Sequence, residues 1–99
     1  MNNTEQGRKD DSAKELMHLI PPKAEMALAR VLTFGAIKYA PNNWRKVENA
    51  SDRYMAAAMR HMNSHRQGEL RDEESGELHL AHALTCLSFL VELLEADNE

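Results

Sequence analysis

Residues 79–95 read His-Leu-Ala-His-Ala-Leu-Thr-Cys-Leu-Ser-Phe-Leu-Val-Glu-Leu-Leu-Glu, and their apolar side chains recur every three or four positions. This spacing is typical of an amphipathic helix. One apolar stripe comprises Leu80, Leu84, Leu87, Val91 and Leu94, and the other comprises Cys86, Phe89 or Leu90, and Leu93. We expect Ser75 to cap this helix, which should extend to roughly Glu95. His79 and His82 continue the second stripe, so they should face the interior or an oligomer seam.

A second helix is expected immediately upstream, between Ser51 as its N-cap and Gly68 as its C-terminal stop. Asp52 falls in its first turn, where the helix dipole favours an anion. One face of this helix carries Tyr54, Ala58, His61 and His65. An adjacent stripe carries Met55, Met59 and Met62, which we expect to fill the core because thioether side chains suit small helical cores.

A first helix should begin at the pair Pro21-Pro22 and end at Lys38 or Tyr39, before Pro41. Proline is well tolerated at the first helical position and prevents a helix from continuing later on. Gly35 inside this helix costs ~1 kcal/mol relative to alanine, which indicates close approach of another backbone or a ligand. Residues 40–50 contain proline and asparagine turn formers without a sustained period, so they are expected to form a loop.

The predicted fold is therefore all-α: a small antiparallel bundle of about three main helices. Residues 1–15 are polar and predict a flexible arm, and residues 16–99 predict a single domain. A chain of 99 residues buries only ~60–70% of the surface that it exposes when unfolded. We therefore expect a homo-oligomer to complete the thin core.

The composition limits the classes of partner and the compartment that we expect for this protein. The chain has 12 Lys and Arg against 16 Asp and Glu, a net charge of −4, which predicts no general nucleic-acid binding. Its single cysteine, Cys86, predicts a reducing compartment and an inert buried thiol. We find neither a signal-peptide pattern nor an apolar run approaching the ~20 residues of a membrane span. These features predict a cytoplasmic protein without a membrane partner.

Four of the five histidines and five of the 16 acidic residues lie between Arg60 and His82. His61 and His65 share one helix face, as do His79 and His82, so each pair could offer imidazole nitrogens to a divalent ion. Turn carboxylates could complete a shell for Mg²⁺, Mn²⁺ or Zn²⁺. The predicted metal ligands are His61, Asp72, Glu74, His79 and His82. Alternatively, the histidines satisfy helix ends or buried hydrogen bonds, and the acidic run is a solvated loop.

The loop around Trp44 is a candidate ligand-binding element. Trp44 could pack as a lid over the core, or it could stack on a nucleobase while neighbouring cations pair with phosphate. A cation such as Lys38 at a helix C-terminus also needs no ligand to explain it. The predicted substrate-binding residues are Lys38, Asn43, Trp44, Arg45 and Arg60.

Several short motifs occur in order along residues 8–94. They are Phe34-Gly35-Ala36-x-Lys38-Tyr39, Asn43-Trp44-Arg45-Lys46, Arg60-His61, Gly68-Glu69, Asp72-x-Glu74-Ser75-Gly76 and His79-Leu80-Ala81-His82-Ala83. With these motifs the chain resembles a phage-associated family, the N-terminal domain of dATP/dGTP diphosphohydrolases. That family is related to the MazZ and MazG enzymes, which are all-α nucleoside triphosphate pyrophosphohydrolases.

This resemblance implies divalent-metal-dependent hydrolysis of dATP or dGTP to the monophosphate and pyrophosphate, in the host cytoplasm if the protein is phage-encoded. Glu69, Asp72 and Glu74 are then the candidate catalytic carboxylates. MazG-like enzymes place Glu-x-x-Glu and Glu-x-x-Asp on successive helices, whereas this chain has His79-x-x-His82 at a comparable place. The alternative is therefore a non-catalytic phage protein that binds a nucleotide or a host protein on the same scaffold.

Overall fold

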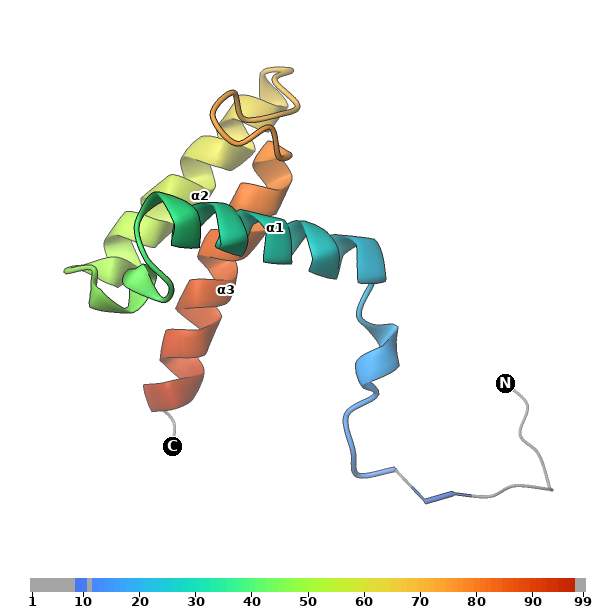
Figure 1. The fold of residues 1–99 in the computed structure, drawn as a ribbon. Coiled ribbons are helices and arrows are strands. Elements are labelled where there is room, and N and C mark those ends of the chain that lie inside the picture. Colours follow the sequence, from blue (N-terminus) through green and yellow to red (C-terminus); the bar gives the residue numbers. More distant parts are fainter. Residues whose placement is uncertain (1–8, 11, 98–99) are drawn as a thin grey trace.

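The computed structural model describes residues 9–10 and 12–97. Three α-helices, α1 (Pro22–Lys38), α2 (Ala50–Arg66) and α3 (His79–Asp97), form the body, and short 3₁₀ helices η1 (Met17–Leu19) and η2 (Asn43–Lys46) lie in the connections. α2 and α3 form an antiparallel hairpin, and α1 crosses α3 obliquely (Figure 1). The all-α class is confirmed: in the described part of the chain, extended pairing is limited to an isolated bridge between Arg71 and Leu78.

Small side chains allow the helices to pack closely. Ala58 on α2 is fully buried, and Ala83 and Cys86 on α3 are almost fully buried. Ala81 on α3 and Leu78, in the loop just before α3, pack against Ala27 and Val31 of α1. Side chains of this size bring helix axes close together, because the side chains at the contact set the interaxial distance.

The predicted helix ends are largely confirmed. α1 begins at Pro22 and ends at Lys38, and α2 stops before Gly68, whose φ of +101° suits glycine. The predicted cap at Ser51 is wrong by a short margin, because α2 already starts at Ala50, after Asn49 in a left-handed conformation. Asparagine tolerates that conformation because its short polar side chain can hydrogen-bond locally.

The predicted cap at Ser75 is wrong. α3 starts at His79, and Ser75 lies in the preceding loop. That loop folds back on itself: the Asp72 backbone N–H donates to the Glu77 carbonyl at 2.8 Å, and the His79 N–H donates to the Leu70 carbonyl at 3.0 Å. Ser75 instead organises the loop, since its backbone N–H donates to the Asp72 carboxylate at 2.8 Å.

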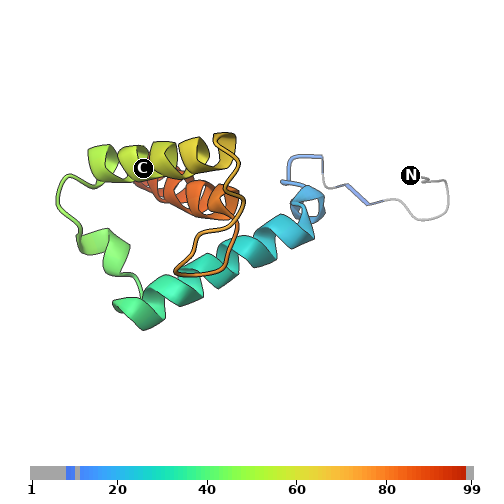
Figure 2. The same cartoon turned by 90° about the horizontal axis from the view of Figure 1, so that it is seen from above.

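An ion pair fixes this loop to α1. Arg30 Nε lies 3.1 Å from both carboxylate oxygens of Glu77, whose side chain is mostly covered. Figure 2 shows the result: the loop between α2 and α3 descends to α1 at one end of the body, and the loop carrying η2 joins α1 to α2 at the other. α1 is therefore held near its middle by this ion pair and at its C-terminal end by the connection through η2.

The expected methionine core is wrong, and of the two expectations for Gly35 the close approach of another backbone is wrong, whereas the approach of a ligand stays a prediction. The methionine stripe is not core in the single chain, because Met55 and Met59 are 46% and 58% exposed. A Cβ added at Gly35 would meet no atom within 4 Å, so no backbone approaches closely there. Both positions face space that another molecule or a ligand could fill.

α3 also corrects the sequence expectation about apolar runs. Its segment 79–96 is long and apolar enough to cross a membrane by length and composition, and 28% of it is buried in the structure. The core helix of a soluble protein meets the same criterion. The predicted flexible arm of residues 1–15 falls partly outside the described residues, and its flexibility stays a prediction.

Candidate functional site

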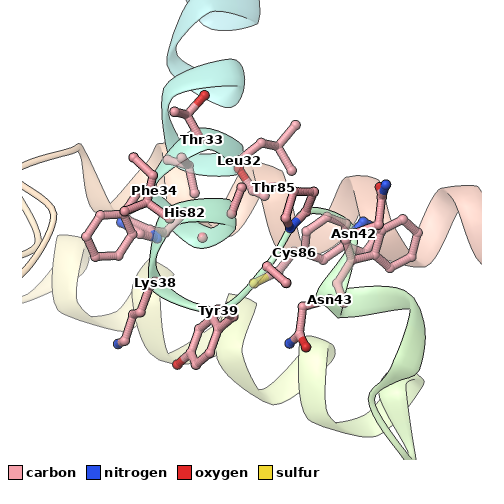
Figure 3. A pocket seen from close by; sticks show the side chains of 18 of the residues that line it. Leu32, Thr33, Phe34, Lys38, Tyr39, Asn42, Asn43, His82, Thr85 and Cys86 are labelled. Atoms are coloured by element: carbon pink, nitrogen blue, oxygen red, sulfur yellow. The ribbon is translucent and has the colours of Figure 1, made fainter.

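A cavity of about 590 Å³ lies between the C-terminal half of α1, the η2 loop and the α2–α3 hairpin. This volume is within the ~300–1,000 Å³ typical of small-molecule sites. Figure 3 shows side chains from α1, the η2 loop and α3 around it, including Phe34, Lys38, Tyr39, His82 and Cys86. The Arg30–Glu77 and Lys38–Glu74 ion pairs hold the C-terminal half of α1 against the loop before α3, so this half of the helix forms one wall of the cavity.

One end of the cavity is aromatic. Trp44 stacks on Phe89 with ring centroids 4.3 Å apart and planes 10° from parallel, and Tyr54 meets Phe89 edge-on at 5.0 Å. Arg45 places its guanidinium 4.4 Å from the Trp44 ring centroid. Since two groups cannot occupy the same face, Arg45 and Phe89 cover opposite faces of the indole. A nucleobase could stack on Trp44 only by displacing Arg45.

The other end carries titratable groups. His61 from α2, His82 from α3, and Asp72 and Glu74 from the loop all line the cavity. The His61 and His82 rings stack at 4.6 Å between centroids, and His82 Nε2 lies 2.6 Å from Ser75 Oγ. The predicted convergence of the two helix ends and the acidic turn is therefore present.

Burial and neighbouring charges set the protonation of these groups. Burial lowers the pKa of His61, and the nearby His82 and His79 lower it further. Burial also lowers the pKa of His82, against the opposing field of Asp72. Both imidazoles are therefore neutral at pH 7 and can accept a proton or bind a cation. Burial opposes ionisation of Asp72, but hydrogen bonds from Ser75 outweigh it, and the pKa of this carboxyl lies below its usual value.

His61, Asp72 and His79 form the tightest group of potential metal ligands. One ligand atom from each lies within 4.8 Å of the others, and His61 Nδ1 is 2.9 Å from His79 Nδ1. His79 is 5% exposed, as expected for an inward-facing residue at the start of α3. Two imidazole nitrogens and a carboxylate oxygen are a donor set that suits a divalent metal.

Around this trio lie the other two predicted metal ligands, His82 and Glu74, and the predicted catalytic carboxylate Glu69. Glu69 Oε1 is 3.4 Å from His79 Nε2, without hydrogen-bond geometry, and does not line the cavity. Glu74 lines it but pairs with Lys38 Nζ at 2.8–3.0 Å. Their catalytic and metal roles stay predictions.

Among the predicted substrate-binding residues, Lys38, Asn43 and Trp44 line the cavity, whereas Arg45 and Arg60 do not. Several lining residues were not predicted as site residues: Phe34, Tyr39, Tyr54, Thr85, Cys86 and Phe89. Ser75, which orders Asp72 and His82, was also missed as a site residue. Three of these residues, Phe34, Tyr39 and Ser75, belong to the motifs quoted above, and that membership was the available signal.

The profile of the family "dATP/dGTP diphosphohydrolase, N-terminal" matches residues 4–99, nearly the whole chain. The chain belongs to this family. Over 88 residues it is 35% identical to a "dATP/dGTP diphosphohydrolase" of Salmonella phage PMBT28. That alignment covers 89% of the chain and 30% of the phage protein, so this member of the diphosphohydrolase N-terminal family spans about a third of that relative's length. No solved structure matches it.

Proposed function

We propose that this chain binds a purine deoxynucleoside triphosphate and, with a divalent ion, hydrolyses it to the monophosphate and pyrophosphate. The observation that carries the proposal is the two-ended cavity, which is aromatic around Trp44 and Phe89 and polar around His61, Asp72 and His82. A purine base would lie against the cavity side of Trp44, Phe89 and Tyr54 rather than stack on the Trp44 face that Arg45 covers, and the phosphates would lie at the polar end. The name of the phage relative supports dATP and dGTP as substrates.

Lys38 is the proposed phosphate contact. Its ammonium lies at the cavity wall, where Glu74 raises its pKa and keeps it charged. A triphosphate would compete with Glu74 for this cation, because charge-assisted hydrogen bonds to phosphate are strong. Asn43, on η2 at the other end of the same wall, is the proposed polar contact to the base or sugar.

In the proposed reaction, a water oxygen bonds to phosphorus and the bridging P–O bond between the α- and β-phosphates breaks, which releases pyrophosphate. The attacking water gives up a proton. Asp72 is the proposed acceptor through one carboxylate oxygen, while the other is available to the ion, since this carboxylate is ionised and lines the cavity with Oδ2 3.8 Å from His82 Nε2. A divalent ion supplies charge neutralisation and lowers the pKa of water. His61, Asp72 and His79 would hold it.

The test is direct. Purified protein is incubated with each of the four common dNTPs and Mg²⁺, Mn²⁺ or Zn²⁺, and pyrophosphate is measured. We expect release from dATP and dGTP, and loss of that release in Asp72→Asn. Lys38→Ala should raise KM, whereas Lys46→Ala, an exposed lysine outside the cavity wall, should not. The absence of pyrophosphate from all four dNTPs with every ion would refute hydrolysis.

A second candidate, nucleotide or host-protein binding without catalysis, is favoured by the coverage of the phage relative. Most of that protein lies outside the matched region, and it could supply catalytic residues that this chain lacks. Saturable dATP binding by calorimetry, together with no turnover, would support this candidate.

A further inference from the structure

The ligand trio contains more nitrogen than Mg²⁺ prefers. His61 from α2 and His79 from α3 bring two imidazoles together, and Asp72 from the loop adds one carboxylate. Mg²⁺ takes oxygen ligands and keeps several waters, whereas imidazole suits zinc and other transition metals. Two histidines and one carboxylate also leave coordination positions open for water or substrate.

We propose that His61, Asp72 and His79 bind a nitrogen-preferring transition-metal dication such as Zn²⁺ in preference to Mg²⁺. This proposal rests on one part of the proposed function, the binding of a divalent ion at this trio. It does not require that the protein hydrolyses a nucleotide. Burial adds to the preference, because the His79 side chain is 6% exposed and cannot be replaced readily by bulk water.

The surroundings of His79 indicate which of its nitrogens binds the ion. Glu69 Oε1 lies 3.4 Å from Nε2, and His61 lies on the side of Nδ1. A carboxylate next to Nε2 favours a proton on that nitrogen, so the Nδ1 lone pair accepts the 2.9 Å hydrogen bond from His61 Nδ1–H, and a bound ion would replace that proton between the two rings. Metal-bound histidines commonly donate their second ring N–H to a carboxylate, and Glu69 Oε1, at 3.4 Å but outside hydrogen-bond geometry, is the carboxylate placed to take that role when the ion binds. Glu69 is therefore a positioning residue that orients His79, and not a direct ligand.

Two side chains next to the trio, Glu74 and His82, already have other polar partners. Glu74 is paired with Lys38, and His82 Nε2 contacts Ser75 Oγ and lies 3.8 Å from Asp72 Oδ2. The His82 ring stacks on His61 and so supports the orientation of that ligand. Neither Glu74 nor His82 is needed to complete the trio.

The experiment uses the full chain, freed of metal by chelator and dialysis, and titrated separately with ZnCl₂ and MgCl₂ in a calorimeter. Zn²⁺ should saturate at one ion per chain, and Mg²⁺ at the same concentrations should not bind. His61→Ala and His79→Ala should abolish Zn²⁺ uptake, whereas His18→Ala, a histidine on η1 outside the trio, should leave it unchanged. Glu69→Gln should weaken Zn²⁺ binding about 10- to 100-fold.

A measurement on the unsubstituted protein covers the case in which the alanine variants fail to fold. In NMR spectra, Zn²⁺ should shift the ring resonances of His61 and His79 but not those of His18. Equal affinity for Mg²⁺, or Zn²⁺ uptake without these shifts, would overturn the proposal. Zn²⁺ binding at the trio without hydrolysis would leave it standing and refute the enzyme. Hydrolysis together with Zn²⁺ binding no tighter than Mg²⁺ binding would refute the ion preference and leave the enzyme standing.

Discussion

Trp44 and Phe89 stack nearly parallel, with centroids 4.3 Å apart, and join the η2 loop to the C-terminal half of α3. Double-mutant cycles on such aromatic pairs give about 0.5–1.5 kcal/mol beyond area burial. We expect Trp44→Ala and Phe89→Ala to show coupling of that size in urea unfolding. Strictly additive effects would mean that the stack contributes nothing specific to stability.

Cys86 gives a pH-dependent prediction. Its thiol lines the cavity, and burial raises its pKa above the usual value. Because only the thiolate reacts, the raised pKa lowers the reactive fraction at neutral pH, and the rate should keep rising as the pH increases through 9. Iodoacetamide labelling, followed by mass spectrometry, should be slow at pH 7.5 and much faster in urea at the same pH. Equal rates in the folded and unfolded chain would contradict it.

The same thiol reports on ligand binding. A nucleotide in the cavity should slow Cys86 labelling further, because Cys86 lies on the cavity wall beside Thr85. Protection should follow dATP or dGTP concentration and disappear in Lys38→Ala at equal nucleotide. Unchanged labelling at saturating dATP would place the nucleotide elsewhere.

The helices were predictable because their signals are local. Pro22 at the first turn, Pro41 beyond the end of α1, and Gly68 after α2 act on their own neighbours in the chain. Ser75 failed as a cap because the choice depends on a partner across the loop: the Asp72 N–H bonds to the Glu77 carbonyl, and α3 starts only after that turn closes. The local sequence around Ser75 therefore does not show whether the helix starts there or whether the loop closes first.

The part of the site that depends on local sequence was also predictable, whereas its long-range contacts were not. Clustering of histidines in the sequence indicated the meeting of His61, Asp72 and His79, since a short connection between two helices makes them antiparallel neighbours. The pairing of Glu74 with Lys38 was not predictable, because these residues are 36 positions apart and meet only when α1 crosses the hairpin. The cavity is likewise a product of that crossing.

Two glycines should respond oppositely to alanine. Gly76 has a φ of +76°, so Gly76→Ala should destabilise the fold by about 1–2 kcal/mol and loosen Ser75 and Asp72. Gly35 lies inside α1 with no atom within 4 Å of an added Cβ, so Gly35→Ala should stabilise by roughly 0.5–1 kcal/mol. Urea unfolding measures both. The same sign at both positions would contradict the assigned backbone roles.

The exposed apolar stripe of α3 is the expected surface for self-association, which we predict because the core of the single chain is thin. Leu84 and Val91 are 40% and 56% exposed on a stripe with alternating spacings of four and three, the repeat of a coiled-coil seam. In the described residues no large side chain is fully buried, so a partner would add core that the single chain lacks. We expect a dimer or larger assembly in sedimentation equilibrium, and dissociation in Leu84→Glu and Val91→Glu. Ile37→Glu is the matched control, because Ile37 is 81% exposed on α1, outside the stripe. A monomeric unsubstituted chain at tens of micromolar would refute self-association through this stripe.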